Sequence, residues 1–106
     1  MSINEVNVGE LAAALAAGAR LVDVRETDEF EAGHVAGAVH VPLGTVPEQV
    51  HAFHGDSVYV ICRSGGRSMR ACEFLSQQGV QASNVAGGTL DWLSSGRPVV
   101  TGSRPL

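Results

Sequence analysis

The chain has 106 residues, of which 44% are apolar and 17% are charged, a balance typical of a folded protein rather than a disordered one. This length accommodates one domain, residues 1–106, with a real hydrophobic core. The net charge of −4 and the pI near 5.4 argue against nucleic acid as a partner, because surfaces that follow phosphate backbones are usually basic.

Strand-like and helix-like patterns alternate along the chain. Asn7 with Glu10, and Thr45 with Glu48, have the spacing of capping boxes, which predicts a helix start at each place. The tail at 98–106 has no clear period. Strands are predicted at 3–6, 21–24, 38–41, 57–61 and 83–86, and helices at 8–17, 27–32, about 45–54, 67–78 and 89–94.

This alternation predicts an α/β fold in which a mostly parallel sheet carries helices on both faces. Ligands of such folds bind beyond the carboxyl ends of the strands. Cys62 lies at such an end, directly after the predicted strand 57–61. We therefore expect the functional site to surround Cys62.

The chain carries no pattern of export or membrane insertion. Residues 1–5 lack the basic start and apolar stretch of a signal peptide, and the apolar segment 11–19 is too short to cross a bilayer. Two cysteines are weak evidence for a disulfide. Cys72 lies on the apolar face of a predicted helix, so we interpret it as a small core residue. We expect a cytoplasmic protein that does not contact a membrane.

The segment 62–68 has the composition of a site that ionises a thiol. Gly65 and Gly66 allow successive N–H groups to converge on the sulfur, and the helix that follows adds roughly half a positive charge. Two arginines supply further cations. All of these favour the thiolate, which is the nucleophilic form of cysteine. The segment consists of Cys62, Arg63, Ser64, Gly65, Gly66, Arg67 and Ser68.

Other polar residues receive structural interpretations. Asp23 and Arg25, at the end of a predicted strand, can pair with each other, and the ring of His34 can bind backbone carbonyls in its turn. His51 and His54 share a predicted helix face, but no further ligand cluster lies near them in the sequence. We expect no metal site.

Three blocks of sequence carry a family resemblance. They are LVDVRE at 21–26 running into FEAGHVAGA at 30–38, the cysteine segment at 62–68, and GGTLDW at 87–92. In order and spacing these blocks resemble the rhodanese (thiosulfate sulfurtransferase) family in its single-domain form. The resemblance implies a five-stranded, mostly parallel sheet flanked by helices, with its core at about 4–97 and a C-terminal tail at 98–106.

The resemblance also implies that Cys62 accepts a sulfane sulfur as a persulfide and passes it to a nucleophilic acceptor. The expected donor is thiosulfate or a persulfide, the expected acceptor is cyanide or a thiol, and a sulfur-relay protein is a further candidate partner. The N–H groups of 63–68 would point at the terminal sulfur. Arg63 and Arg67 would orient the sulfonate of the donor, and the hydroxyls of Ser64 and Ser68 would add hydrogen bonds. No cofactor is implied.

Three further functions are compatible with the cysteine loop. Cysteine-dependent phosphatases and arsenate reductases have a similar layout, but they place one residue more between the cysteine and the arginine than the four that separate Cys62 from Arg67. The tighter loop suits a single sulfur atom better than a tetrahedral anion. A sulfur carrier without turnover of its own would use the same loop, and so would a persulfide or redox sensor.

Overall fold

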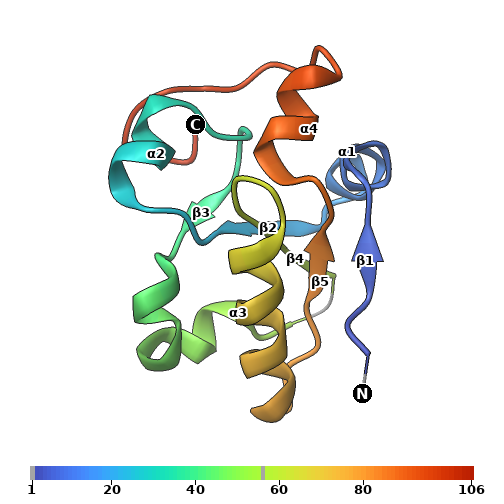
Figure 1. The fold of residues 1–106 in the computed structure, drawn as a ribbon, viewed down its shortest axis with the longest axis vertical. Helices are drawn as coiled ribbons and strands as arrows, with labels where there is room; N and C mark the ends of the chain where they lie inside the picture. The colour runs from blue at the N-terminus through green and yellow to red at the C-terminus, as the bar shows by residue number, and fades with distance from the viewer. Residues whose placement is uncertain (1, 56) are drawn as a thin grey trace.

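The computed structural model describes residues 2–55 and 57–106. All pairs of neighbouring strands in its five-stranded sheet are parallel, and the strand order is β1-β5-β4-β2-β3 (Figure 1). The predicted α/β fold is confirmed, and the sheet is parallel throughout. The elements are β1 (Glu5–Val6), α1 (Val8–Ala16), β2 (Arg20–Asp23), α2 (Thr27–Ala32), β3 (Val39–His40), the 3-10 helix η1 (Leu43–Phe53), β4 (Val58–Ile61), α3 (Gly66–Gln77), β5 (Ser83–Val85) and α4 (Gly88–Ser94).

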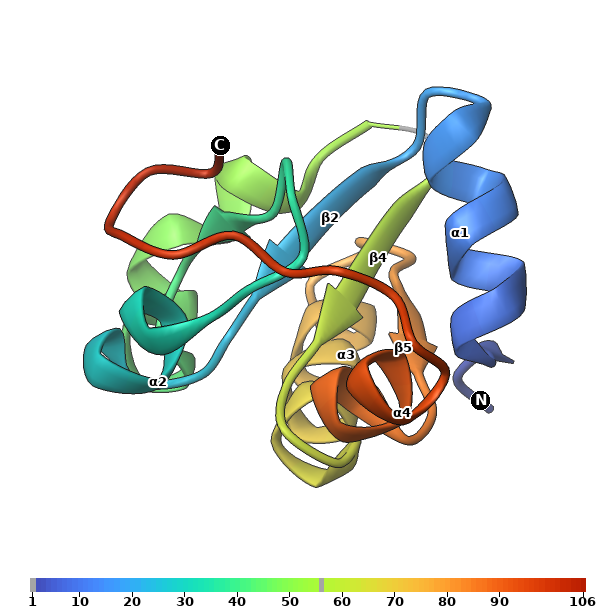
Figure 2. The same ribbon diagram turned by 90° about the horizontal axis from the view of Figure 1, so that it is seen from above.

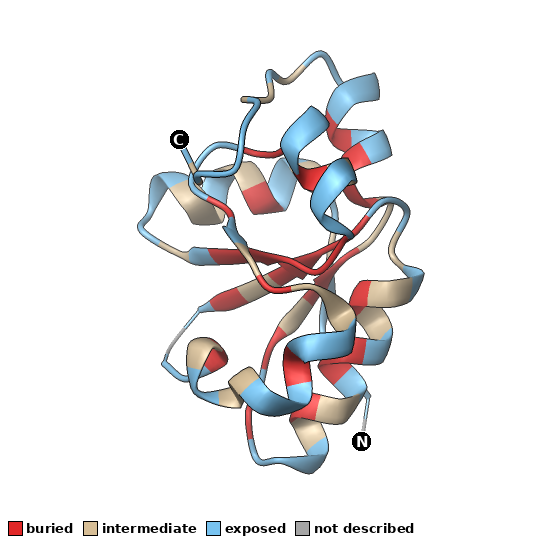
Figure 3. Ribbon diagram, turned by 90° about the vertical axis from the view of Figure 1, so that its left-hand side faces the viewer, coloured by how far each residue is buried: buried red, intermediate tan, exposed pale blue. Residues whose placement is uncertain are grey.

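Helices cover both faces of the sheet, as predicted (Figure 2). α3 and η1 pack on one face, where Phe53 and Leu75 lie against Val60, and α1, α2 and α4 pack on the other, around Leu11 and Phe30. The inward sides of the helices and the central strands are buried, while the outward sides of the helices are exposed (Figure 3). Among the described residues, no helix combines the length and apolarity needed to cross a bilayer.

The first predicted helix start is confirmed and the second is wrong. The Asn7 side chain accepts a hydrogen bond from the Glu10 N–H at 2.8 Å, and the Glu10 carboxylate accepts one from the Asn7 N–H at 2.9 Å. The Thr45 hydroxyl instead donates to the Pro42 carbonyl at 2.8 Å, so it does not cap a helix.

The segment after Pro42 forms a 3-10 helix rather than the predicted α-helix at 45–54. Pro47 lies inside it and has no N–H to donate, and Gln49 has non-helical angles of φ −127° and ψ 31°. The missing donor and the kink interrupt the regular hydrogen bonds that a continuous α-helix requires.

The C-terminal tail returns across the molecule to α2 (Figure 2). His34 and Val100 exchange two backbone hydrogen bonds of 2.8 Å. The buried ring of His34 lies 2.8 Å from the Phe30 carbonyl oxygen and 3.1 Å from that of Pro105. The predicted role of His34 as a residue that binds carbonyls is therefore confirmed, and one of these carbonyls belongs to the tail.

Candidate active site

The central strand β4 delivers Cys62 to the carboxyl edge of the sheet. β4 lies between β2 and β5, so the ends of several parallel strands meet around the cysteine. Cys62 is 1% exposed. Gly65 then adopts φ 112°, a left-handed conformation that turns the chain into α3 at Gly66.

The sulfur of Cys62 accepts two hydrogen bonds from its own loop. The Gly65 nitrogen lies 3.1 Å from Sγ, and the Ser68 hydroxyl oxygen lies 3.2 Å from it. Burial raises the pKa of the thiol, but hydrogen bonds from the Ser68 hydroxyl and from the N–H groups of Ser68, Gly65 and Ser64 together outweigh it. The pKa of Cys62 therefore lies below the ordinary thiol value, which favours the thiolate.

The start of α4 holds the other side of the cysteine loop. The Thr89 N–H and hydroxyl both donate to the Cys62 carbonyl, at 2.9 and 3.0 Å, and the Leu90 N–H donates to the Arg63 carbonyl at 3.0 Å. A Cβ on Gly88 would stand 2.6 Å from each of these two carbonyl oxygens. The start of α4 can therefore approach the cysteine loop this closely only because residue 88 has no side chain.

Asn84 supports the loop from β5. Its side-chain nitrogen lies 3.2 Å from the Gly65 carbonyl oxygen and 2.9 Å from a carboxylate oxygen of Glu5, and the residue is 1% exposed. The same Gly65 residue therefore receives a bond from Asn84 at its oxygen and donates to Cys62 at its nitrogen. Sequence reasoning missed Asn84 and Thr89. A polar residue inside a strand of the core is the signal that could have marked Asn84.

The two arginines of the loop have different surroundings. Both terminal guanidinium nitrogens of Arg67 bind the Glu29 carboxylate of α2, at 2.7 and 2.9 Å, whereas the Arg63 side chain is exposed. The hydrogen bond from Arg67 is the main reason that the pKa of Glu29 falls to about 2. Glu29 raises the pKa of Arg67, and the nearby Cys62 thiolate raises it further.

Of the predicted loop residues, Ser64, Gly65 and Ser68 place hydrogen-bond donors at the sulfur of Cys62, and the exposure of the loop residues differs. Ser64 and Gly66 are exposed, while Ser68 is buried beneath the sulfur. Sequence reasoning also missed Glu29. Glu29 lies three residues after Glu26, the spacing of a capping box, and its carboxylate accepts a hydrogen bond from the Glu26 N–H at 3.0 Å. Its second role, the pairing with Arg67, depends on a contact between residues 38 positions apart.

Asp23 and Arg25 form a buried ion pair with a closest approach of 2.8 Å, as predicted. Arg25 also donates to the Gly33 carbonyl at 2.7 Å and so ties β2 to the end of α2. Cys72 is fully buried in the core, as predicted, and its burial raises the pKa of its thiol to about 12. Cys72 is therefore a poor second nucleophile.

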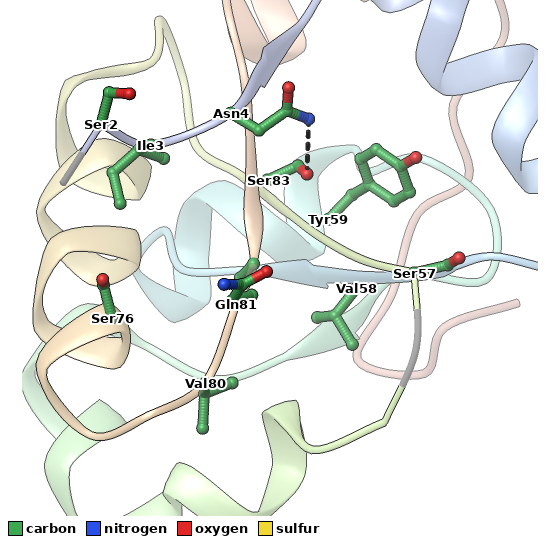
Figure 4. A pocket seen from close by; sticks show the side chains of 11 residues that line it. Ser2, Ile3, Asn4, Ser57, Val58, Tyr59, Ser76, Val80, Gln81 and Ser83 are labelled. Atoms are coloured by element: carbon green, nitrogen blue, oxygen red, sulfur yellow. Dashed lines mark hydrogen bonds between the residues drawn. The ribbon is translucent and has the colours of Figure 1, made fainter.

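A hollow of about 450 Å³ lies at the opposite edge of the sheet (Figure 4). It is lined by the amino ends of β4 and β5, with Asn4 and Ser83 joined by a hydrogen bond of 2.8 Å. Within the described ranges, no group of three or more metal-ligating side chains gathers there or elsewhere. The nucleophilic sulfur and the hydrogen-bond donors around it lie instead at Cys62.

Comparisons with known proteins agree with this geometry. Residues 7–95 match the family model described as a rhodanese-like domain. The chain is 39% identical to YtwF of Bacillus subtilis over 101 residues, which cover 92% of this chain and 98% of the relative. It is 34% identical to a sulfurtransferase of Allochromatium vinosum over 102 residues, which cover 92% and 95%. The crystal structure of a rhodanese-related protein from Thermoplasma volcanium matches with a TM-score of 0.85 at 34% identity, covering 93% of this chain and 99% of that one.

Proposed function

This chain belongs to the rhodanese family, and from that premise we propose that it transfers a sulfane sulfur from thiosulfate or a persulfide to a thiophilic acceptor through a persulfide on Cys62. The observation that carries the proposal is the pair of hydrogen bonds that Sγ accepts from Gly65 and Ser68, at 3.1 and 3.2 Å. Donors aimed at a sulfur atom stabilise the negative charge that is present before and after the transfer.

In the first half-reaction the Cys62 thiolate attacks the outer sulfur of the donor. With thiosulfate, the S–S bond of the donor breaks, sulfite leaves with the bonding electron pair, and Cys62 becomes a persulfide anion. With a persulfide R–S–S⁻, the thiolate R–S⁻ leaves instead. In the second half-reaction cyanide or a thiolate attacks the terminal sulfur and Cys62 leaves as the thiolate, so no net oxidation occurs. The activated nucleophile and the covalent intermediate are those of nucleophilic catalysis.

The residues around the sulfur have distinct parts in this proposal. The Gly65 N–H and the Ser68 hydroxyl hold the thiolate and then the persulfide. Arg63, which is exposed beside the cysteine, is the cation available to attract an anionic donor. Ser64 supplies an N–H on the loop, and Gly66 opens the helix whose N-terminus faces the site.

Intact mass spectrometry after treatment with thiosulfate tests the proposal. The protein should gain the mass of one sulfur atom, and cyanide should remove it with release of thiocyanate. Cys62→Ser should abolish both events, while Cys72→Ser should retain most activity because its thiol is buried and protonated. A stable persulfide with negligible turnover would favour a sulfur carrier, and efficient hydrolysis of an aryl phosphate without persulfide formation would favour a phosphatase.

A further inference from the structure

The Arg67 guanidinium, which sequence reasoning assigned to the sulfonate of the donor, is already occupied. Its two terminal nitrogens bind the two oxygens of Glu29 at 2.7 and 2.9 Å, the paired geometry in which a guanidinium binds a carboxylate most strongly. A sulfonate presents the same kind of anionic oxygens and would need the same nitrogens. The intramolecular carboxylate therefore competes directly with an anionic donor.

The Glu29 carboxylate keeps its negative charge at physiological pH. Arg67 lowers the pKa of Glu29 to about 2, so the carboxylate is ionised and the pair is neutral as a whole. Glu26, which is exposed at the start of α2, adds negative charge close enough to raise the pKa of Arg67 further. Glu29 is held in place from a second direction, because its carboxylate also accepts the Glu26 N–H at 3.0 Å.

We infer that Glu29 is a positioning residue that sets donor selectivity: by holding Arg67, it favours donors with a single negative charge at the persulfide and disfavours the thiosulfate dianion. This inference rests on the proposed sulfur transfer. A persulfide R–S–S⁻ with a neutral R group presents its terminal sulfur to Cys62 and has no sulfonate that needs a partner. Thiosulfate must either displace Glu29 from Arg67 or bind with Arg63 and the loop N–H groups alone.

The test measures the second-order rate constant for persulfide formation on Cys62 by rapid mixing, acid quench and intact mass, with two donors. The donors are thiosulfate and the persulfide of N-acetylcysteamine, whose body is neutral. Glu29→Gln keeps a side-chain oxygen for the Glu26 N–H but removes the charge that holds Arg67. Its rate constant with thiosulfate should rise about tenfold, since a charge-assisted hydrogen bond becomes available to the sulfonate. With the persulfide of N-acetylcysteamine it should change by less than about threefold.

Glu31→Gln is the matched control, because Glu31 is exposed on the same helix and makes the same change in net charge. It should alter neither rate constant by more than about twofold. In the double variant Glu29→Gln/Arg67→Gln the gain with thiosulfate should disappear, because the freed guanidinium is its source. Should Glu29→Gln fail to fold, Glu29→Asp, whose side chain is one methylene shorter and reaches Arg67 less well, should show a smaller gain in the same direction.

Equal changes with both donors, an unchanged or slower reaction with thiosulfate, or a gain that survives in the double variant would each overturn the inference. These outcomes are distinct from failure of the proposed function. If the wild-type protein formed no persulfide with either donor, the sulfur-transfer proposal itself would be wrong. If it used both donors and Glu29→Gln left their ratio unchanged, only the role of Glu29 would be refuted.

Discussion

Replacing Gly88 with alanine should damage both stability and the reactivity of Cys62. The new Cβ would stand 2.6 Å from the Cys62 and Arg63 carbonyl oxygens, against about 3.5 Å at ordinary van der Waals contact. The φ of 58° at Gly88 adds left-handed strain of about 1 kcal/mol for any residue with a Cβ. Separating α4 from the loop would also weaken the two bonds that the Thr89 and Leu90 N–H groups donate to these carbonyls, at about 1 kcal/mol each.

The expected loss of unfolding free energy for Gly88→Ala is therefore about 3 kcal/mol, or a fall in Tm of roughly 10–20 °C. Gly96→Ala is the matched control, because Gly96 has φ 82° but a Cβ added to it would meet no atom within 4 Å. It should lose only about 1 kcal/mol. Thermal unfolding measures both, and the pH dependence of iodoacetamide alkylation reports the thiol, whose midpoint should rise in Gly88→Ala as the loop N–H groups turn away. Equal destabilisation of the two variants, with an unchanged alkylation profile, would show that the contact between α4 and the cysteine loop does not hold the loop in place.

Three further predictions concern the same site. The pH midpoint of alkylation of wild-type Cys62 should lie below the value of about 8.5 for a free thiol, because the loop hydrogen bonds favour the anion. A midpoint at or above about 8.5 would show that these hydrogen bonds do not stabilise the thiolate. Asn84→Leu should slow alkylation at pH 7 by about twofold to tenfold, since the Gly65 peptide loses its support, and an unchanged rate in a folded variant would remove that role. Glu29 has a lowered pKa of about 2, so its contribution to stability is complete above its ordinary pKa of 4.5 and is lost as the pH falls toward 2. The stability difference between wild type and Glu29→Gln, measured by urea unfolding, should therefore be about 1 kcal/mol at pH 7 and shrink toward zero as the pH falls through 2; a difference independent of pH would contradict the ion pair.

The features that the sequence predicted correctly depend on local patterns. The apolar run before Cys62, the glycines after it and the helical spacing beyond them are all encoded within a few residues of one another. The Asn7 capping box was recognisable for the same reason. The Thr45 box failed although its residue types were suitable, because the Thr45 hydroxyl donates to the Pro42 carbonyl and Pro47 interrupts a regular α-helix.

The features that sequence reasoning missed depend on contacts between distant segments. Glu29 meets Arg67 across 38 positions, Asn84 reaches Gly65 across 19, and Thr89 reaches Cys62 across 27. Glutamate and threonine at these positions carry no local sign of such partners, and the place of Asn84 inside a core strand marks it as unusual without indicating its partner. Their roles follow from the strand order, which places β2, followed by α2, on one side of β4 and β5, followed by α4, on the other.

The dependence of the cysteine loop on β5 and α4 has a consequence for the newly synthesised chain. During translation Cys62 leaves the ribosome before Asn84, Thr89 and Leu90 have been made, and the edge strand β1 also waits for its partner β5. Until those late residues dock, the Gly65 carbonyl lacks its bond from Asn84, and the Cys62 and Arg63 carbonyls lack those from Thr89 and Leu90. We expect the cysteine to behave more like an ordinary, mostly protonated thiol in that state. We therefore expect an unfinished chain to be slow to react with sulfur donors and oxidants, so that its reactivity begins only when the protein is complete.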